Sequence, residues 1–208
     1  LEPEDQPEIV TGRATIEAIT EVGREIVEVA LLPRKPIVFL PGQYGKFSFR
    51  GLPPRAFSPT APLDRIREDG RIRLNIKRVR RGLVTPRVGT SIAKGHSVRI
   101  EGPLGSAYLR RGERGRLILI GGGTGFAPVW SIATAALKEN FARPIVILAS
   151  ARSRDAFYMA PALRLVSRFP NVTVVACIDD PREAAVADVH QDVFDRIQGA
   201  HAKSRLTS

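Results

Sequence analysis

Hydrophobic and polar residues alternate differently in the two halves of the chain. In the first half, short runs alternate with period two, as in residues 13–19, 26–29 and 71–79. Turn-forming residues separate these runs, for example Gly23 and Gly70. Alternation of this period places apolar side chains on one face of a strand. Several short strands with turns between them predict a small antiparallel β-barrel.

The second half instead contains continuous apolar runs. These are residues 117–120, 144–149 and 172–178. Runs of this kind are typical of strands that are buried on both faces. Apolar residues at helical spacing follow each run, over residues 127–139, 159–169 and 187–197. Alternating strands and helices predict an α/β domain with a doubly wound parallel sheet.

The chain of 208 residues has room for two small domains. The change of pattern falls in the charged loop at residues 109–115. We therefore expect a barrel domain over residues 8–112 and an α/β domain over residues 113–208.

Basic residues dominate the charge of the chain, which is +11. Residues 65–114 hold fourteen Lys or Arg and only four Asp or Glu, so this stretch accounts for most of the excess. Such a field attracts anions, although a solvated basic face without a partner has the same composition. Tyr108 is the single aromatic residue in the stretch, and no nucleic-acid-binding signature occurs. We expect no nucleic-acid partner; a basic nucleic-acid-binding module stays as an alternative that a salt-dependent titration would test.

The scarcity of cysteine limits the possible metal chemistry. Cys177 is the single cysteine, and the three histidines lie far apart in the sequence. This composition excludes a disulfide framework and a four-cysteine zinc or iron–sulfur centre within the chain, so we expect no metal site. No apolar run reaches the ~18 residues of a membrane span, and no secretory leader is evident. We expect a cytoplasmic protein without membrane insertion.

A glycine cluster, residues 121–125, joins the first buried strand of the second half to the helix that follows. Glycines let a phosphate approach the backbone, and the helix N-terminus supplies N–H groups and a positive dipole end. The spacing differs from G-x-G-x-x-G because Pro128 occupies the third position, and no P-loop lysine follows. The cluster predicts dinucleotide binding rather than a plain strand–helix turn.

Four motifs together resemble the ferredoxin–NADP(+) reductase family. The pattern GGGTGxxP follows an all-β half in which Arg55–Ser58 (RAFS) is similar to Arg-x-Tyr-Ser. Residues 82–85 (GLVT) resemble the flavin-phosphate turn of the family, and residues 102–105 (GPLG) resemble the close of its barrel. The motifs occur in family order over residues 8–180. The chain is most similar in pattern to NAD(P)H-dependent reductase components of bacterial oxygenases.

The resemblance implies FAD in the barrel half. Arg55 would pair with the FAD pyrophosphate, and Phe57 would stack on the isoalloxazine without the tyrosine hydroxyl usual in the family. Ser58 would hydrogen-bond near flavin N5 and is one of two implied catalytic residues. The remaining implied FAD-binding residues are Ala56, Ile76, Lys77, Gly82, Leu83, Val84 and Thr85.

The resemblance also implies NADH or NADPH in the second half. Thr124, the other implied catalytic residue, would lie between flavin and nicotinamide. The pyrophosphate would be held by Gly121, Gly122, Gly123, Gly125 and Pro128. Ser150, Arg152 and Arg154 would meet the adenosine ribose, where arginines can bind a 2′-phosphate but also occur in NADH-using relatives. The choice between NADH and NADPH stays open.

One family motif, Cys/Gly-Gly-Pro-x-x-Met, has no counterpart near the end of the chain. Residues 198–208 contain neither a Gly-Pro pair nor a methionine. The resemblance therefore implies that the nucleotide half is incomplete, as in a truncated or divergent chain, and that it holds NAD(P)H weakly.

The resemblance implies a flavin-dependent oxidoreductase that passes electrons from NAD(P)H through FAD to a ferredoxin or similar one-electron acceptor. The acceptor would be an acidic ferredoxin or iron–sulfur protein or domain, steered by the basic stretch. Its cluster would lie outside this chain, because the chain has one cysteine. The alternative is a flavin- or nucleotide-binding subunit without turnover that serves regulation or assembly.

Overall fold

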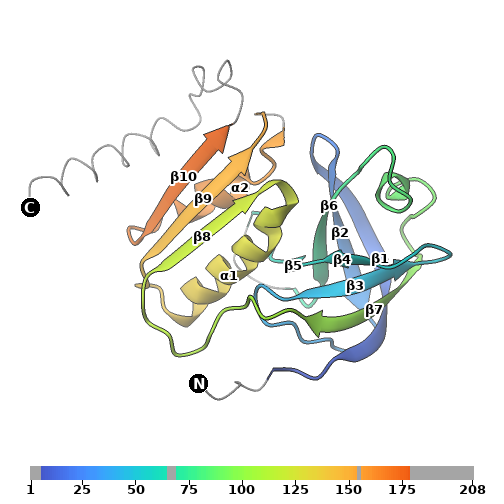
Figure 1. Ribbon diagram of the computed structural model, residues 1–208, viewed down its shortest axis with the longest axis horizontal. Coiled ribbons are helices and arrows are strands. Elements are labelled where there is room, and N and C mark those ends of the chain that lie inside the picture. Colours follow the sequence, from blue (N-terminus) through green and yellow to red (C-terminus); the bar gives the residue numbers. More distant parts are fainter. Residues whose placement is uncertain (1–5, 65–68, 154–155, 179–208) are drawn as a thin grey trace, which may run out of the picture.

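Two sheets of different topology confirm the predicted fold class (Figure 1). The computed structural model describes residues 6–64, 69–153 and 156–178. Within these ranges, the first half of the chain forms a curved seven-stranded antiparallel sheet, and the second half forms a three-stranded parallel sheet. No helix in the described ranges is long and apolar enough to cross a membrane.

The antiparallel sheet has the strand order β4-β3-β7-β1-β2-β6-β5. Its long strand β1 pairs with β2 on one side and with β7 on the other. A register shift between Ile16 and Ala18 bends β1, as bulges do, and helps the sheet to curl. The strands are β1 (Val10–Gly23), β2 (Ile26–Pro33), β3 (Tyr44–Phe49), β4 (Arg55–Phe57), β5 (Pro59–Thr60), β6 (Ile72–Lys77) and β7 (Ser97–Leu104), with the 3₁₀ helix η1 (Thr85–Arg87) between the last two.

The period-two pattern of the sequence corresponds to an inner and an outer face of this sheet. Ala14 and Ile16 of β1 are fully buried, whereas Arg13 and Glu17 point to the other face. The inner side chains of β2, β3, β6 and β7 join them in one apolar core. Burial of this alternating set is what favours the curled sheet.

The parallel sheet has the order β10-β9-β8, and glycines lead from its edge strand into the first helix. The 3₁₀ helix η2 precedes α1, and Pro128 lies in the first turn of α1, where its missing N–H removes no helical bond. The elements are β8 (Leu117–Gly122), η2 (Gly123–Gly125), α1 (Phe126–Glu139), β9 (Ile145–Ala151), α2 (Ala160–Val166) and β10 (Val172–Ile178). The helix expected over residues 187–197 lies outside the described residues.

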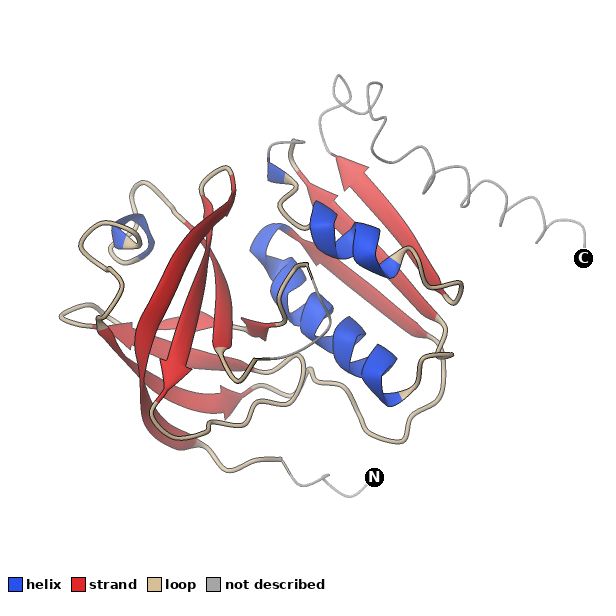
Figure 2. Cartoon of the chain, turned by 180° about the vertical axis from the view of Figure 1, so that it is seen from behind, coloured by secondary structure: helices blue, strands red, loops and turns tan. Residues whose placement is uncertain are grey.

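The expectation that the first apolar run is buried on both faces is wrong for β8. Leu119 is buried, but Ile118 and Ile120 are 64% and 72% exposed. In the described part of the chain, α1 and α2 both pack on the sheet face that carries Leu119 and Ile147 (Figure 2). The continuous apolar run therefore predicts the strand β8 correctly but does not show that both of its faces are buried.

The two halves share a core and are joined by hydrogen bonds. Ile26 and Leu63 of the first half belong to the same buried cluster as Trp130 of α1. The Trp130 indole N–H donates to the Pro62 carbonyl oxygen at 2.8 Å. These contacts fix the barrel against the helix that follows the glycine turn.

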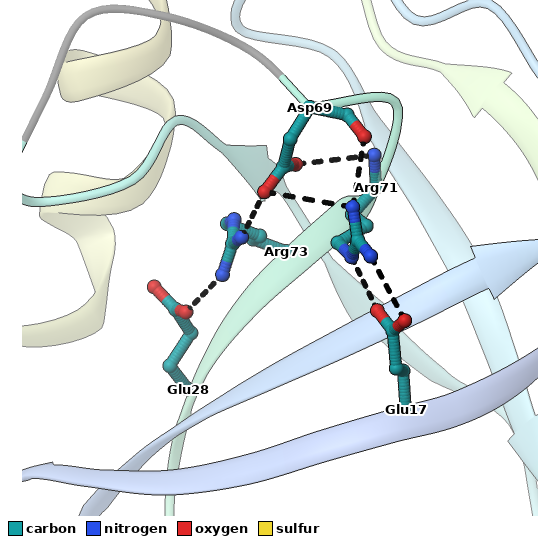
Figure 3. A network of polar contacts seen from close by, with 5 residues as sticks. All are labelled: Glu17, Glu28, Asp69, Arg71 and Arg73. Atoms are coloured by element: carbon teal, nitrogen blue, oxygen red, sulfur yellow. Dashed lines mark hydrogen bonds and ion pairs between the residues drawn. The ribbon is translucent and has the colours of Figure 1, made fainter.

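An ion-pair network fastens the start of β6 to the outer face of the barrel (Figure 3). The Arg71 guanidinium donates two hydrogen bonds to the Glu17 carboxylate of β1, one of them at 2.9 Å. Arg73 donates to Glu28 of β2 at 2.5 Å and also pairs with Asp69. Because Asp69 also contacts Arg71, the five charges form one connected network across three strands.

Candidate functional site

A cleft of about 550 Å³ lies between the two halves. Its walls come from the β1–β2 hairpin, the end of β6, the glycine turn and the loop after β9. The barrel contributes Arg24, Glu25, Ile26 and Lys77, and the second half contributes Gly122, Gly123, Thr124, Ser150, Ala151, Arg152, Ser153 and Ala156. The volume lies within the range of ~300–1,000 Å³ that ligand sites have.

Close packing explains the glycines at the start of the turn. A Cβ on Gly121 would lie 2.9 Å from the Val129 side chain and 3.0 Å from the Gly125 carbonyl oxygen. A Cβ on Gly122 would lie 2.6 Å from the Ser150 hydroxyl. Gly123 has a φ of +51°, in the left-handed region that favours glycine. The sequence thus lets the backbone pass close to β9 and turn sharply into α1.

The end of this turn is open and positively polarised. A Cβ on Gly123 or Gly125 would meet nothing within 4 Å. Gly125 is the N-cap residue of the 14-residue helix α1, and in the described chain no side chain caps this end. The Phe126 N–H is already bonded to carbonyl oxygens of the turn and Pro128 has no N–H, so this end attracts an anion chiefly through the helix dipole. This arrangement fits a phosphate or pyrophosphate.

Lys77 ends β6 on the opposite wall of the cleft. It is exposed and pairs in register with Ile26 of β2. The preceding side chain, Ile76, is only 1% exposed and lies in the barrel core. Of these two predicted cofactor-binding residues, only Lys77 presents its side chain to the cleft.

The predicted flavin motif Arg55–Ser58 lies on β4 and the link to β5, outside the cleft lining. Arg55 is exposed, and its guanidinium donates to the neighbouring Pro54 carbonyl oxygen at 3.0 Å. Ala56 is exposed, and Ser58 is half-buried. Phe57 rests against Phe47 of the core, with ring centroids 6.0 Å apart, which leaves part of its ring accessible.

The predicted flavin-phosphate turn, residues 82–85, lies in a loop of the barrel whose two ends are joined by hydrogen bonds. It is also outside the cleft lining. The Gly82 N–H donates to the Val79 carbonyl oxygen at 2.7 Å, and the Val79 N–H donates to the Thr85 hydroxyl at 3.0 Å. Leu83 is 60% exposed, whereas Val84 is buried at 1%. Val84 can therefore offer a ligand only its backbone.

The cleft unites some of the predicted residues and adds others. Those brought together are Lys77, Gly122, Gly123, Thr124, Ser150 and Arg152. Gly121, Gly125 and Pro128 belong to the same turn and helix but do not line the cleft, and Arg154 lies outside the described residues. The residues that sequence reasoning missed include Arg24 and Glu25, because residues 23–25 indicate only a hairpin turn.

Tyr158, in the region expected near the ribose, is instead an internal link between the halves. It is 3% exposed, and its hydroxyl accepts a hydrogen bond of 3.4 Å from the Asn75 side chain of β6. Burial raises the pKa of the Tyr158 hydroxyl, which therefore stays neutral. Tyr158 positions the loop after β9 rather than facing the cleft.

Comparison with known proteins identifies both halves. Residues 14–108 match the oxidoreductase FAD-binding domain, and residues 119–205 match the oxidoreductase NAD-binding domain. The chain therefore belongs to the oxidoreductases that join these two domains, as its resemblance to the ferredoxin–NADP(+) reductase family implied. The order of the two domains is the one expected from the four sequence motifs.

Reductase components of oxygenases are among the curated members of the family that the chain resembles. It is 37% identical over 163 residues to the ferredoxin–NAD(P)(+) reductase component of the naphthalene 1,2-dioxygenase/salicylate 5-hydroxylase systems of Ralstonia sp., covering 78% of this chain and 48% of that protein. It is 34% identical over 180 residues to the corresponding naphthalene 1,2-dioxygenase component of Pseudomonas putida, covering 84% and 54%. The chain spans about half the length of these relatives.

Solved structures of reductases share the fold. Amycolatopsis cytochrome P450 reductase GcoB aligns with a TM-score of 0.74 at 27% identity, over 84% of this chain and 54% of that one. The ferredoxin reductase in carbazole 1,9a-dioxygenase aligns with a TM-score of 0.68 at 26% identity, over 82% and 50%. The open glycine turn and the exposed cations Arg55 and Lys77 suit the FAD and NAD(P)H that these domain types bind.

Proposed function

We propose that this chain is the FAD- and NAD(P)H-binding part of an oxidoreductase that passes electrons from NAD(P)H through FAD to a ferredoxin or similar one-electron acceptor. One observation carries the proposal: Lys77 of the FAD-type half and the glycine turn of the NAD-type half line the same cleft. Such a cleft brings two cofactors into one site. We propose residues 8–112 and 113–208 as the two domains.

In this proposal, FAD is held by exposed groups on the barrel. Arg55 binds its pyrophosphate, Phe57 packs on its ring system, and the backbone of the turn at residues 82–85 holds neighbouring groups. The partly buried Ser58 hydroxyl orients the reacting edge of the flavin. FAD, when bound, supplies the conversion between two-electron and one-electron transfer.

The second half then places NAD(P)H against the same site. The backbone at Gly122 and Gly123 and the start of α1 bind the pyrophosphate. Thr124 lines the cleft opposite the barrel wall and separates the two cofactor positions. Ser150 and Arg152 meet the adenosine ribose, as does Arg154 by sequence.

The proposed acceptor is an acidic iron–sulfur protein or domain in the cytoplasm. Named relatives of this chain are reductase components of oxygenase systems, including that of Ralstonia sp.. The basic stretch at residues 65–114 would accelerate the encounter with an acidic acceptor. Raising the salt concentration should therefore slow acceptor reduction without slowing flavin reduction.

The absorbance spectrum of the purified, FAD-reconstituted chain tests the proposal. We expect flavin bands near ~370 and ~450 nm that NADH or NADPH bleaches without oxygen. Arg55→Ala should release FAD, whereas Arg13→Ala, an exposed arginine on the outer face of β1, should retain it. Absence of bound flavin would refute the proposal, and bound flavin that neither cofactor bleaches would favour a binding subunit without turnover.

A further inference from the structure

The tip of the β1–β2 hairpin has an unusual backbone for its sequence. The strands pair as far as Gly23 and Ile26, which leaves Arg24 and Glu25 as the turn. Glu25 has a φ of +61° and is the single non-glycine residue with positive φ in the described ranges. Unfavourable conformations of this kind persist where the surroundings enforce them, and they cluster at ligand sites.

Contacts on both sides hold this hairpin tip in place. The Glu25 carbonyl oxygen accepts a hydrogen bond of 2.7 Å from the Arg78 N–H, next to Lys77. Ile26 is 2% exposed and packs in the core cluster that contains Trp130 of α1. The tip is thus anchored to the end of β6 and to the second half, near the carboxyl ends of β8 and β9 (Figure 1).

The cleft has a cationic side chain on each wall. Arg24 and Lys77 come from the barrel, and Arg152 comes from the loop after β9, with the glycine turn between them. Glu25 is the single acidic residue in the described lining, and its carboxylate pairs with Arg80 at 3.6 Å. The lining therefore favours a multiply charged anion that reaches from one half to the other.

We propose that Arg24 and Arg152, one from each half, together bind a phosphate of the nicotinamide dinucleotide, so that the β1–β2 hairpin completes the NAD(P)H site from the flavin side. This inference rests on the proposed function. A guanidinium binds phosphate oxygens in pairs, which gives both strength and orientation. Arg24 already interacts within the folded chain, so nucleotide binding extends or replaces that contact.

Two phosphate sources are chemically equivalent for Arg24. The pyrophosphate occurs in both NADH and NADPH, whereas the 2′-phosphate occurs only in NADPH. If Arg24 binds the pyrophosphate, its removal weakens both cofactors alike. If it binds the 2′-phosphate, its removal weakens NADPH alone.

The test is anaerobic stopped-flow reduction of the FAD-loaded chain at increasing NADH or NADPH. Arg24→Ala and Arg152→Ala should each raise the apparent dissociation constant about 10-fold or more, as expected for a lost hydrogen bond to a charged group. The rate at saturation and the FAD absorbance should stay at the wild-type level. Arg24→Lys, which keeps the positive charge but not the paired N–H donors of the guanidinium, should recover part of the affinity.

Arg13→Ala is the matched control, because Arg13 lies on the same strand β1 but lines a separate groove on the outer face with Arg34 and Arg99. It should leave both dissociation constants unchanged. If circular dichroism shows that Arg24→Ala impairs folding, Arg24→Gln, which keeps most of the length of the side chain, is tested in place of Arg24→Ala. Unchanged dissociation constants for both cofactors in the folded Arg24 variant would overturn the inference. If wild-type flavin is not reduced at all, the proposed function fails instead, and equilibrium titration with NADH and NADPH still decides the role of Arg24.

Discussion

Replacing Trp130 by phenylalanine should weaken the junction between the halves. Trp130 is fully buried, stacks on Phe126 with centroids 6.2 Å apart, and donates its indole N–H to the Pro62 carbonyl oxygen. Phenylalanine keeps an aromatic ring in the core but cannot donate this hydrogen bond. Because Pro62 is itself buried, its carbonyl oxygen would be left without this donor in an apolar environment.

The expected cost follows from these two losses. A buried carbonyl without its donor costs about 1–3 kcal/mol. The smaller ring adds about 1 kcal/mol for the lost contacts and the partial cavity. Trp130→Phe should therefore lower the free energy of unfolding by about 2–4 kcal/mol, a large fraction of the ~5–15 kcal/mol typical of a folded protein. Trp130→Ala should cost more, because it removes the ring altogether.

Urea denaturation followed by far-UV circular dichroism measures this change, since the variants lack the single tryptophan of the chain and with it the usual fluorescence probe. With a slope of about 2 kcal/mol per molar urea, the middle of the usual range, the midpoint should fall by about 1–2 M. The control is Val38→Ala between β2 and β3, where the side chain is 60% exposed; its midpoint should hardly move. A midpoint shift for Trp130→Phe no larger than that of the control would refute the reasoning.

Three further changes test other parts of the structure. Gly121→Ala should destabilise the protein by about 1–3 kcal/mol and weaken the binding of NAD(P)H, because the new methyl group overlaps α1. The control in the same denaturation assay is Gly115→Ala, where the space around the new methyl group is open. Arg73→Met should lower the free energy of unfolding by about 2 kcal/mol, because it leaves the partly buried carboxylates of Glu28 and Asp69 without this cationic partner. A change below about 0.5 kcal/mol would contradict this. Hydrogen bonding from Arg71 lowers the pKa of Glu17 below 4.5. At Asp69, burial raises the pKa of the carboxyl, but hydrogen bonds and charges from Arg73 and Arg71 together outweigh burial and hold the pKa below 3.8. Both carboxylates therefore add stability above their ordinary pKa values, and this stability is lost as the pH falls through the lowered pKa values. Acid titration of Tm should show this decline, and Arg73→Met should reduce the part of it that comes from Asp69, because Arg73 hydrogen-bonds that carboxylate.

The sequence was sufficient to predict the glycine turn, the barrel strands β1, β2 and β6, and the described strands and helices of the second half. Period-two alternation predicts the barrel strands because the inner side chains, such as Ile16, must be buried while Glu17 remains outside. The glycines at residues 121–123 were identifiable because close packing and positive φ exclude other residues there. These features could be predicted because each depends on the residue types at neighbouring positions of the sequence.

The contribution of the β1–β2 hairpin to the cleft could not be predicted in the same way. Arg24 is separated from Gly122 by almost half the chain, and the packing of the two halves, in which Ile26 takes part, brings them together. The exposed face of β8 was missed for a related reason: Ile118 and Ile120 look like core residues because an apolar run does not reveal which face is covered. Both features depend on tertiary arrangement.

The residues that join the halves are close neighbours of those that form the cleft. Ile26 packs in the shared core beside Glu25 of the cleft wall, and Tyr158 bonds to the barrel two residues after Ala156. The same short segments therefore determine both the packing and the binding geometry. Arg55 and the turn at residues 82–85 lie on the barrel alone. Loosening the junction should therefore reduce the affinity for NAD(P)H before it reduces the affinity for FAD. That order of loss follows from where the contacts are, whichever residue of the junction is changed.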